Sequence, residues 1–257
     1  PGERFLDAST PQARRVAARA LLLRTAKPGD GPVSRRLNRP VSRVFSRAML
    51  ALGLRPIHAS AVSLAIGLAS AWCAAQPAPL AFALAGFLFH AASVFDGVDG
   101  EMARVTLSES RRGAVIDTAI DNHTFLACLA GLRLGRQRHG SGGAGLARLA
   151  GLVAGVPLVL GSVALLVRRH APDGSFVHFA TWVGRASRQP GSPASLRLAQ
   201  RLFLLTRRDV FALVLMLASF AGSRALLAGL VAFGVALAAY VLLFHRRRLV
   251  ACTHLAD

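Results

Sequence analysis

The chain has 257 residues, of which 53% are hydrophobic and 17% charged, and its mean hydropathy is +0.47. These values exclude a single water-soluble globule. The net charge of +19 would indicate a nucleic acid partner for a soluble protein, but here the basic residues share the chain with long apolar runs, so a membrane protein that binds no nucleic acid is the better interpretation.

The first 55 residues form a basic, water-facing end. They carry twelve Lys or Arg and no apolar run long enough to cross a bilayer. A hydroxyl at Thr10 followed by Pro11 suits a helix start and predicts a helix over residues 13–24. The sequence KPGDGP at residues 27–32 then ends that helix.

Residues 33–55 have the pattern of an amphipathic helix. Apolar residues recur at helical spacing between arginines, and Pro40 predicts a kink or a restart. Such a segment lies naturally on an anionic membrane surface. The alternative, an arginine-rich solvated face packed on another domain, stays open.

Six apolar runs follow and predict six membrane crossings, the fifth of them short. They are residues 57–76, 79–95, 114–134, 149–167, 210–222 and 225–244. Because about 20 helical residues span a bilayer, we expect an all-α integral membrane protein. It has an N-terminal amphipathic juxtamembrane helix, six transmembrane helices over residues 56–248, and a cytoplasmic tail at 249–257.

The charge distribution predicts how these helices are oriented. An even number of crossings puts both ends on one side, and the basic ends place that side in the cytoplasm of a multi-pass protein of the cell (inner) membrane. The loop at 133–148 disagrees, because its four arginines fall on the outer side. The long connection at 170–206 is predicted to be a loop with an interfacial helix at 196–205.

Six of the twelve carboxylates in the chain lie between Asp96 and Asp121, where the second apolar run ends and the third begins. Carboxylates at membrane depth are costly unless they are neutralised. Asp96 and Asp99 are three residues apart and Asp117 and Asp121 four apart, so each pair lies on one helix face. Two such faces predict a four-carboxylate site for two ions, and oxygen ligands suit Mg²⁺, Mn²⁺ or Ca²⁺ rather than zinc.

Small residues and an arginine accompany these carboxylates. Gly97 and Gly100 open a groove beside the first pair, and Gly113 lies four residues before Asp117. Such glycines allow a flat ligand or a neighbouring helix to approach the backbone. Arg104 follows Gly100 by one turn and is placed to reach phosphate oxygens. Each of these features alone is more often a matter of helix packing, but the set indicates a diphosphate site.

The residues from Asp96 to Asp121 follow the pattern D-x2-D-G-x2-A-R-x8-G-x3-D-x3-D. This pattern resembles the signature of the CDP-alcohol phosphotransferase family and agrees with it at all eight specified positions. The resemblance covers about residues 33–248. It implies six membrane helices in a homodimer, with an amphipathic helix ahead of the first. Glu101 and Glu109 are outside the pattern, and we expect both to be exposed helix-end charges.

The resemblance also implies roles for the carboxylates. Asp96, Asp99 and Asp117 would hold two Mg²⁺ or Mn²⁺ ions, with Asp121 touching the second ion and serving as general base. The base takes the proton of an acceptor hydroxyl, which attacks the β-phosphorus of a CDP-alcohol. CMP then leaves, with its charge neutralised by the metals.

Further residues are assigned to the nucleotide by the same resemblance. Gly100, Ala103 and Arg104 would line the cytidine diphosphate site, and Gly113 would keep the two metal-bearing helices close. Many family members begin the first membrane helix with Pro-Asn and a Thr three residues later. Here that Asn is absent, and Ser60 stands in place of the Thr and can still contact the nucleotide.

A phosphorylated acceptor would need cationic side chains near the cytoplasmic helix ends. The candidates are Arg111, Arg112, Arg201, Arg207 and Arg208. The alternative, that these arginines only mark the cytoplasmic side, is about equally well founded.

The front of the chain is similar to a domain junction. Residues 21–40 look like the junction in bifunctional inositol-phosphate cytidylyltransferase and di-inositol-phosphate phosphate synthase proteins. By this resemblance residues 1–32 are the tail of an upstream nucleotidyltransferase domain, which would make the CDP-alcohol that the present chain consumes.

The leading hypothesis is therefore a membrane enzyme that transfers a phosphoalcohol from CDP to a hydroxyl, in phospholipid or inositol-phosphate phosphodiester synthesis. A divalent-cation or proton-coupled transporter is the alternative, since intramembrane carboxylates also mark ion paths. Transport favours midplane sites in two related halves, whereas these acids cluster at one helix mouth. A basic membrane-anchoring module would leave the carboxylates unexplained.

Overall fold

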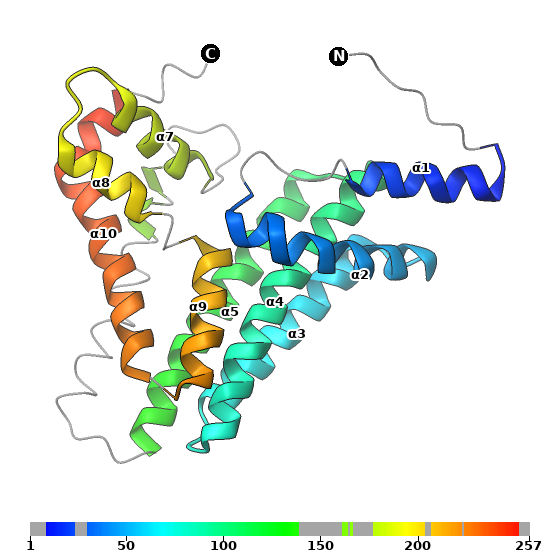
Figure 1. The fold of residues 1–257 in the computed structure, drawn as a ribbon, viewed down its shortest axis with the longest axis horizontal. Helices are drawn as coiled ribbons and strands as arrows, with labels where there is room; N and C mark the ends of the chain where they lie inside the picture. The colour runs from blue at the N-terminus through cyan, green and yellow to red at the C-terminus, as the bar shows by residue number, and fades with distance from the viewer. Residues whose placement is uncertain are drawn as a thin grey trace.

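The computed structural model describes residues 9–23, 30–138, 161–163, 165–166, 177–203, 207–222 and 224–251. Every regular element in these ranges is helical, as the sequence predicts. The centre is a bundle whose helices run side by side (Figure 1). Its members are α3 (Pro56–Ala74), α4 (Pro79–Val105), α5 (Arg111–Arg138) and α9 (Arg208–Phe220). Helix α4 packs on α3 and α9, while α5 packs on α3.

The first helix, α1, spans Pro11–Leu23. The hydroxyl of Thr10 accepts a hydrogen bond from the backbone N–H of Ala13 at 3.1 Å, which satisfies one of the open N–H groups of the first turn. The predicted helix start at this hydroxyl and proline is therefore confirmed.

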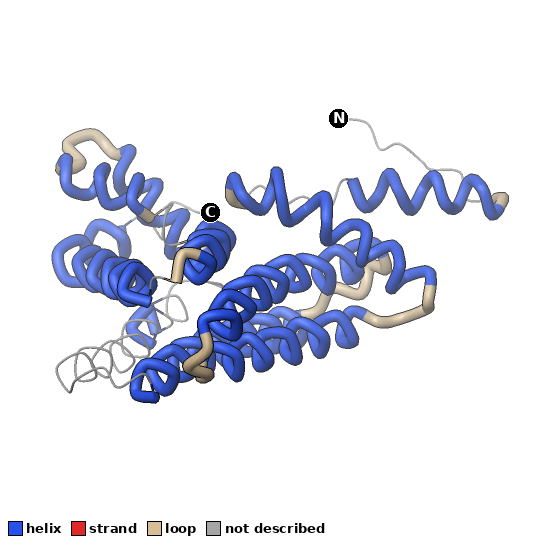
Figure 2. Tube along the Cα trace, turned by 60° about the horizontal axis from the view of Figure 1, so that its bottom comes forward, coloured by secondary structure: helices blue, strands red, loops and turns tan. Residues whose placement is uncertain are grey.

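The predicted amphipathic segment folds as a short π-helical turn, η1 (Ser34–Asn38), that continues into α2 (Arg39–Ala51). Pro40 is the second residue of α2, directly after the π-helical turn, and a proline inside a continuous helix removes one backbone hydrogen bond. Helix α2 lies across one end of the bundle and packs on α4 (Figures 1 and 2). It turns Ser42 and Ser46 inward and leaves apolar side chains, among them Val44 at 61% exposed, on its outer face.

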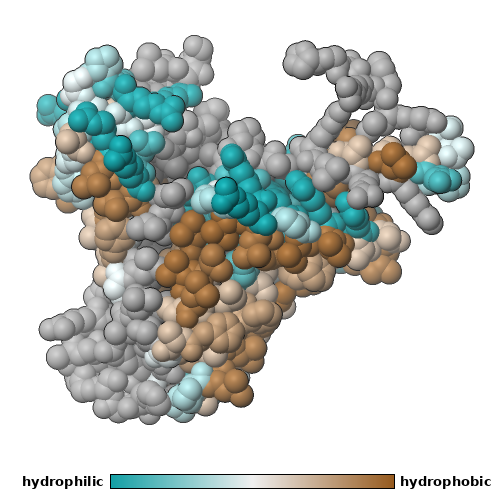
Figure 3. Space-filling view, in the orientation of Figure 1, coloured by the Kyte–Doolittle hydropathy of each residue, from teal (hydrophilic) through white to brown (hydrophobic). Residues whose placement is uncertain are grey.

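Two of the described helices, α3 and α4, are long and apolar enough to cross a membrane. Helices α5 and α10 (Arg224–Ala251) cover the third and sixth predicted crossings as continuous helices, and α9 covers the fifth as a short one. The predicted crossing at 149–167 falls mainly outside the described residues, as does the glycine-rich stretch before it. In Figure 3 apolar residues cover much of the visible bundle, beneath a band of hydrophilic ones that follows α2.

The connection predicted as a loop with one interfacial helix is different in the structure. It contains two helices, α7 (Val177–Arg188) and α8 (Ala194–Leu202), joined by a turn in which Gly191 has φ +72°. Leu196 of α8 is fully buried in a cluster with Trp182 of α7 and Leu249 of α10. The amphipathic pattern was detected correctly, but the apolar face of α8 is covered by protein. A pattern in sequence shows that a face is apolar and does not show what covers it.

Small residues bring the bundle helices into close contact. Ser63 and Ser70 of α3 donate hydrogen bonds to backbone carbonyls of α4, at 3.2 and 2.7 Å. Gly131 of α5 faces the carbonyl oxygen of Ala71, which would lie 2.2 Å from a Cβ atom at that position. Close approach through small residues and interhelical hydrogen bonds is typical of helix packing in membranes, and it holds both α4 and α5 against α3.

Candidate active site

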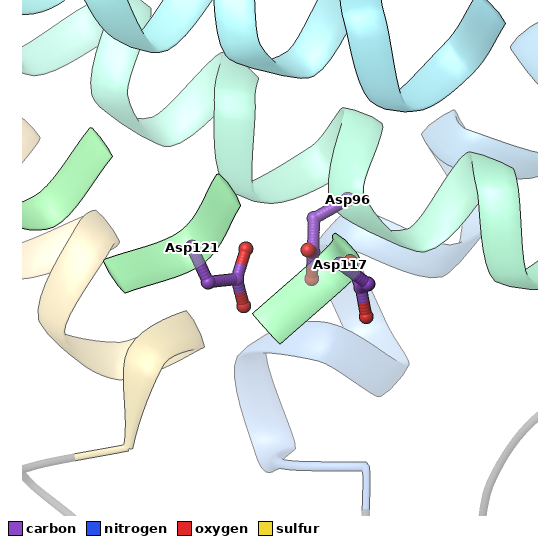
Figure 4. A group of neighbouring side chains, drawn as sticks. All are labelled: Asp96, Asp117 and Asp121. Carbon is purple, nitrogen blue, oxygen red and sulfur yellow. The ribbon is translucent and has the colours of Figure 1, made fainter. Parts of the chain in front are cut away.

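Three carboxylates converge at the end of the bundle over which α2 lies. Asp96 comes from the last turns of α4, and Asp117 and Asp121 come from the first turns of α5 (Figure 4). Their nearest oxygens all lie within 4.8 Å of one another, and each side chain is half-buried. The four-residue spacing on α5 puts its two carboxylates on one face, and that face is turned toward Asp96.

This donor set fits a divalent cation. Like charges at this separation repel one another unless a cation lies between them. Carboxylate oxygens without His or Cys are the ligands that Mg²⁺ and Mn²⁺ prefer. Within the described residues, the three aspartates are the group whose ligand atoms are close enough to share an ion.

The fourth predicted metal ligand, Asp99, is outside this group. Its side chain is buried, 7% exposed, and its Oδ2 accepts a hydrogen bond from the hydroxyl of Ser60 at 2.5 Å. The structure therefore brings together three of the four predicted carboxylates and pairs the other with a residue predicted to contact the nucleotide. Ser60 lies in the first turns of α3, so three helices contribute to this end of the bundle.

The predicted nucleotide residues of α4 follow Asp99 in the last two turns of that helix. Gly100, Ala103 and Arg104 are all half-buried. A Cβ atom at Gly100 would lie 3.2 Å from Arg104 Nη1, so the absence of a side chain makes room for the guanidinium. Arg104 Nη1 is also 4.0 Å from the carboxylate of Glu109, whose side chain is 66% exposed. Glu109 is thus exposed, as predicted.

Gly113 lies in the first turn of α5, and its N–H donates to the hydroxyl of Ser110 at 3.0 Å. That hydroxyl is also the atom nearest to a Cβ at Gly113, at 3.1 Å. The close contact of Gly113 is therefore within its own turn, and it gives no direct support to the predicted role of drawing α5 toward α4.

Four of the five predicted acceptor arginines lie at or next to helix starts. Arg111 and Arg208 are the first residues of α5 and α9, and Arg112 is exposed. Arg207 precedes α9 and lies 3.6 Å from the carboxylate of Asp209, which accepts a hydrogen bond from the backbone N–H of Ser34 at 2.9 Å. The start of α9 thus meets η1, at the end of the bundle that α2 covers. Arg201 is exposed on α8.

The expectation for Glu101 was wrong. Its side chain is fully buried, 0% exposed, and it binds α2: Arg39 Nη1 donates to it at 2.8 Å, and the hydroxyls of Ser42 and Ser46 donate at 2.8 and 2.7 Å. Glu101 lies near the end of α4, which runs to Val105, but α2 covers the face on which it lies. Contact with a helix so distant in the chain is the reason for the error.

A sequence signal for this contact exists. Arg39, Ser42 and Ser46 are spaced three and four residues apart, so they form a polar strip along one face of an otherwise apolar and basic helix. Burial lowers the pKa of the Arg39 guanidinium, but its hydrogen bonds to Asp30 and Glu101 outweigh this effect, and the pKa lies above its usual value.

Comparison with known proteins agrees with the motif. The family model described as CDP-alcohol phosphatidyltransferase matches residues 54–220, which contain all three clustered aspartates.

Curated relatives named "Bifunctional IPC transferase and DIPP synthase" are similar to this chain over about half of its length. The protein of Rubrobacter xylanophilus is 35% identical over 150 residues, which is 58% of this chain and 34% of that protein. The protein of Archaeoglobus fulgidus is 35% identical, over 50% of this chain and 26% of its own length. The protein of Thermococcus kodakarensis is 37% identical, over 49% of this chain and 29% of its own length. The matched region thus spans about a third or less of these relatives.

Proposed function

The chain belongs to the CDP-alcohol phosphatidyltransferase family, and from this premise we propose that it transfers a phosphoalcohol group from a CDP-alcohol to an acceptor hydroxyl and releases CMP. The observation that carries the proposal is the convergence of Asp96, Asp117 and Asp121 from two helices, with oxygens within 4.8 Å of one another. A cluster where α4 ends and α5 begins, beside Arg104, suits a diphosphate better than the transport path considered as the alternative.

Two divalent ions, Mg²⁺ or Mn²⁺, would be held by Asp96, Asp99 and Asp117, with Asp121 on the second ion. When bound, the ions supply charge neutralisation for the diphosphate and the departing CMP. Asp99 would reach an ion while keeping its hydrogen bond with Ser60, since a carboxylate has two oxygens and accepts several bonds. Ser60 then orients a metal ligand and lies beside the nucleotide.

We propose the remaining roles as the family resemblance implies them. Gly100, Ala103, Arg104 and Gly113 border the cytidine diphosphate, with Arg104 binding phosphate oxygens through its fork of donors. Arg111, Arg112, Arg207 and Arg208 bind a phosphorylated acceptor such as an inositol phosphate or glycerol phosphate. The names of the relatives support the inositol-phosphate class, which places the reaction in phosphodiester synthesis.

Transfer is a displacement at phosphorus. Asp121 takes the proton of the acceptor hydroxyl, whose oxygen forms a bond to the β-phosphorus. The bond from that phosphorus to the bridging oxygen breaks, and the electron pair leaves with CMP. Arg104 holds the diphosphate in line during this exchange.

We further propose the membrane arrangement that the sequence predicts: six transmembrane helices over 56–248, both termini and the active site on the cytoplasmic side of the inner membrane, and a homodimer in the lipid bilayer. The segment 33–55 lies at the bilayer surface, and the exposed apolar face of α2 supports this placement. Residues 1–32 would connect the membrane domain to an upstream nucleotidyltransferase domain, and 249–257 would end the chain in the cytoplasm.

The activity is tested with the purified chain in lipid vesicles. The chain is incubated with CDP-inositol or CDP-diacylglycerol and a panel of hydroxyl acceptors, and CMP is measured with Mg²⁺, with Mn²⁺ and with a chelator. We expect CMP release that needs both an acceptor and the metal. Metal flux across the vesicles without CMP release from any donor would overturn transfer in favour of transport.

Replacing Ser60 by alanine should lower kcat/KM about tenfold. The variant loses the hydrogen bond to the Asp99 carboxylate, and bonds to charged groups contribute about 1.5–3 kcal/mol. The measurement is the initial rate of CMP release at several donor concentrations. Ser63→Ala is the matched control, because it removes a hydrogen bond to Ala92 on the same helix pair without touching Asp99. Equal rates in the two variants would contradict the role of Ser60.

A further inference from the structure

Glu101 is the most deeply buried carboxylate in the described part of the chain, with 0% exposed, and the family pattern assigns it no role. Both of its oxygens are engaged: Oε1 accepts from Arg39 and Ser42, and Oε2 accepts from Ser46, all at 2.7 to 2.8 Å. A buried carboxylate persists only when it is paired and its acceptor positions are filled. All three donors belong to α2, which makes this carboxylate an anchor for that helix.

Arg39 is in turn held from both sides. Its Nε and Nη2 donate to the two oxygens of Asp30, each at 2.9 Å, and its Nη1 contacts the carbonyl oxygen of Gly97 at 3.5 Å as well as Glu101. This bidentate pairing with one carboxylate fixes the plane of the guanidinium. Arg39 thus links the segment before α2, helix α2 itself and the metal-bearing end of α4.

This contact adjoins the metal cluster along α4. The carbonyl that Arg39 touches belongs to the residue after Asp96, and Glu101 lies two residues after Asp99 and three before Arg104. A Cβ atom at Gly97 would be 3.4 Å from Arg39 Nη1 and 3.5 Å from Ser42 Oγ, so glycine there permits the close approach of α2. The same turns of α4 therefore carry the metal and nucleotide residues on one face and Glu101, which binds α2, on the neighbouring face.

We propose that Glu101 is a positioning residue for the transfer reaction: by holding Arg39, Ser42 and Ser46 it fixes the interfacial helix α2 against the turns of α4 that carry Asp96, Asp99 and Arg104. The inference rests on the proposed function of that site. Helix α2 lies on the bilayer surface through its exposed apolar face, so the anchor sets the depth and rotation of the metal turns relative to that surface. A buried ion pair adds little net stability compared with well-packed apolar residues. The effect of the Arg39–Glu101 pair is therefore to fix how α2 is oriented on α4.

The test is Glu101→Gln in the full chain reconstituted in vesicles. The amide keeps the size of the side chain but loses its charge and one acceptor oxygen. We expect kcat to fall about ten- to a hundredfold, since displacements near 1 Å are enough for such losses, and the half-saturating Mn²⁺ concentration, read from the spin resonance of free Mn²⁺, to rise about fivefold or more. Ser70→Ala is the control, because it removes a buried hydrogen bond from α3 to Ala85 of α4, about three turns from Asp96, and it should keep wild-type values.

A second variant covers the case in which Glu101→Gln does not fold. The double substitution Ser42→Ala and Ser46→Ala keeps the Arg39–Glu101 pair and removes two hydroxyl bonds, and we expect a kcat about three- to tenfold lower with weaker Mn²⁺ binding. Folded variants with wild-type kcat and Mn²⁺ binding, even if they melt earlier, would overturn the positioning role. If the wild type releases no CMP, the proposed function fails, while the Mn²⁺ comparison still decides whether Glu101 positions the cluster.

Discussion

Replacing Asp121 by asparagine should abolish CMP release, with kcat lower by about a thousandfold. The asparagine has nearly the same size but cannot accept the proton of the attacking hydroxyl, and general base catalysis contributes about 10²–10⁴-fold. The donor nucleotide should still bind, because Gly100, Ala103 and Arg104 lie on α4 and are unchanged. The measurement pairs the rate of CMP release with equilibrium binding of labelled donor to the same vesicles.

The control for this substitution is Ser70→Ala, which removes a hydrogen bond to Ala85 of α4, about three turns from Asp96, and should leave both readouts at the wild-type level. A rate within tenfold of the wild type in Asp121→Asn would remove Asp121 as the base. Loss of donor binding together with the rate would assign Asp121 to holding the metal and diphosphate, with the base elsewhere.

Replacing Asp117 by asparagine should weaken divalent metal binding by about a hundredfold or more and abolish CMP release at ordinary Mg²⁺ concentrations. The variant removes one of three carboxylates whose oxygens lie within 4.8 Å of one another, and even residues that only support metal ligands cost about 10–100-fold when they are removed. Mn²⁺ titration followed by spin resonance measures the affinity directly. Asp96→Asn should have an effect of similar size, although Asp96 lies on another helix, because both carboxylates serve one site.

Asp99→Asn completes the series, because Asp99 lies outside the group of three and hydrogen bonds to Ser60. A loss of Mn²⁺ affinity comparable to that of Asp117→Asn would support a ligand set of four carboxylates. Wild-type Mn²⁺ affinity in Asp117→Asn and Asp96→Asn alike would refute the metal site altogether.

Much of the site could be predicted because its residues lie within two helical segments. Spacings of three and four residues place side chains on one helix face whatever the rest of the chain does. Asp117 and Asp121 are therefore neighbours by local geometry alone, and α5 meets Asp96 because α4 and α5 are consecutive helices joined by a short connection. The start of α1 at Thr10 and Pro11 is predictable for the same reason, since a helix cap depends on a few adjacent residues.

Contacts between distant segments were not predictable in this way. Glu101 was expected to be an exposed charge at the helix end, yet α2, about 60 residues earlier in the chain, covers it. The same holds for the helix predicted at 196–205, which was expected to lie at the membrane interface and whose Leu196 is buried beside Trp182. In both cases the local pattern was correct and the partner was unknown.

The amino-acid sequence by itself determined the helical elements, the amphipathic character of the segment ahead of the bundle, and the set of carboxylates that could share an ion, because periodicity and spacing act within one helix. Only the tertiary structure decided that three of these carboxylates meet while Asp99 binds Ser60, and that Glu101 joins α4 to α2. The physical reason is that a side chain's burial and partners depend on which faces of distant helices are packed together, and the energies of those contacts belong to pairs of segments.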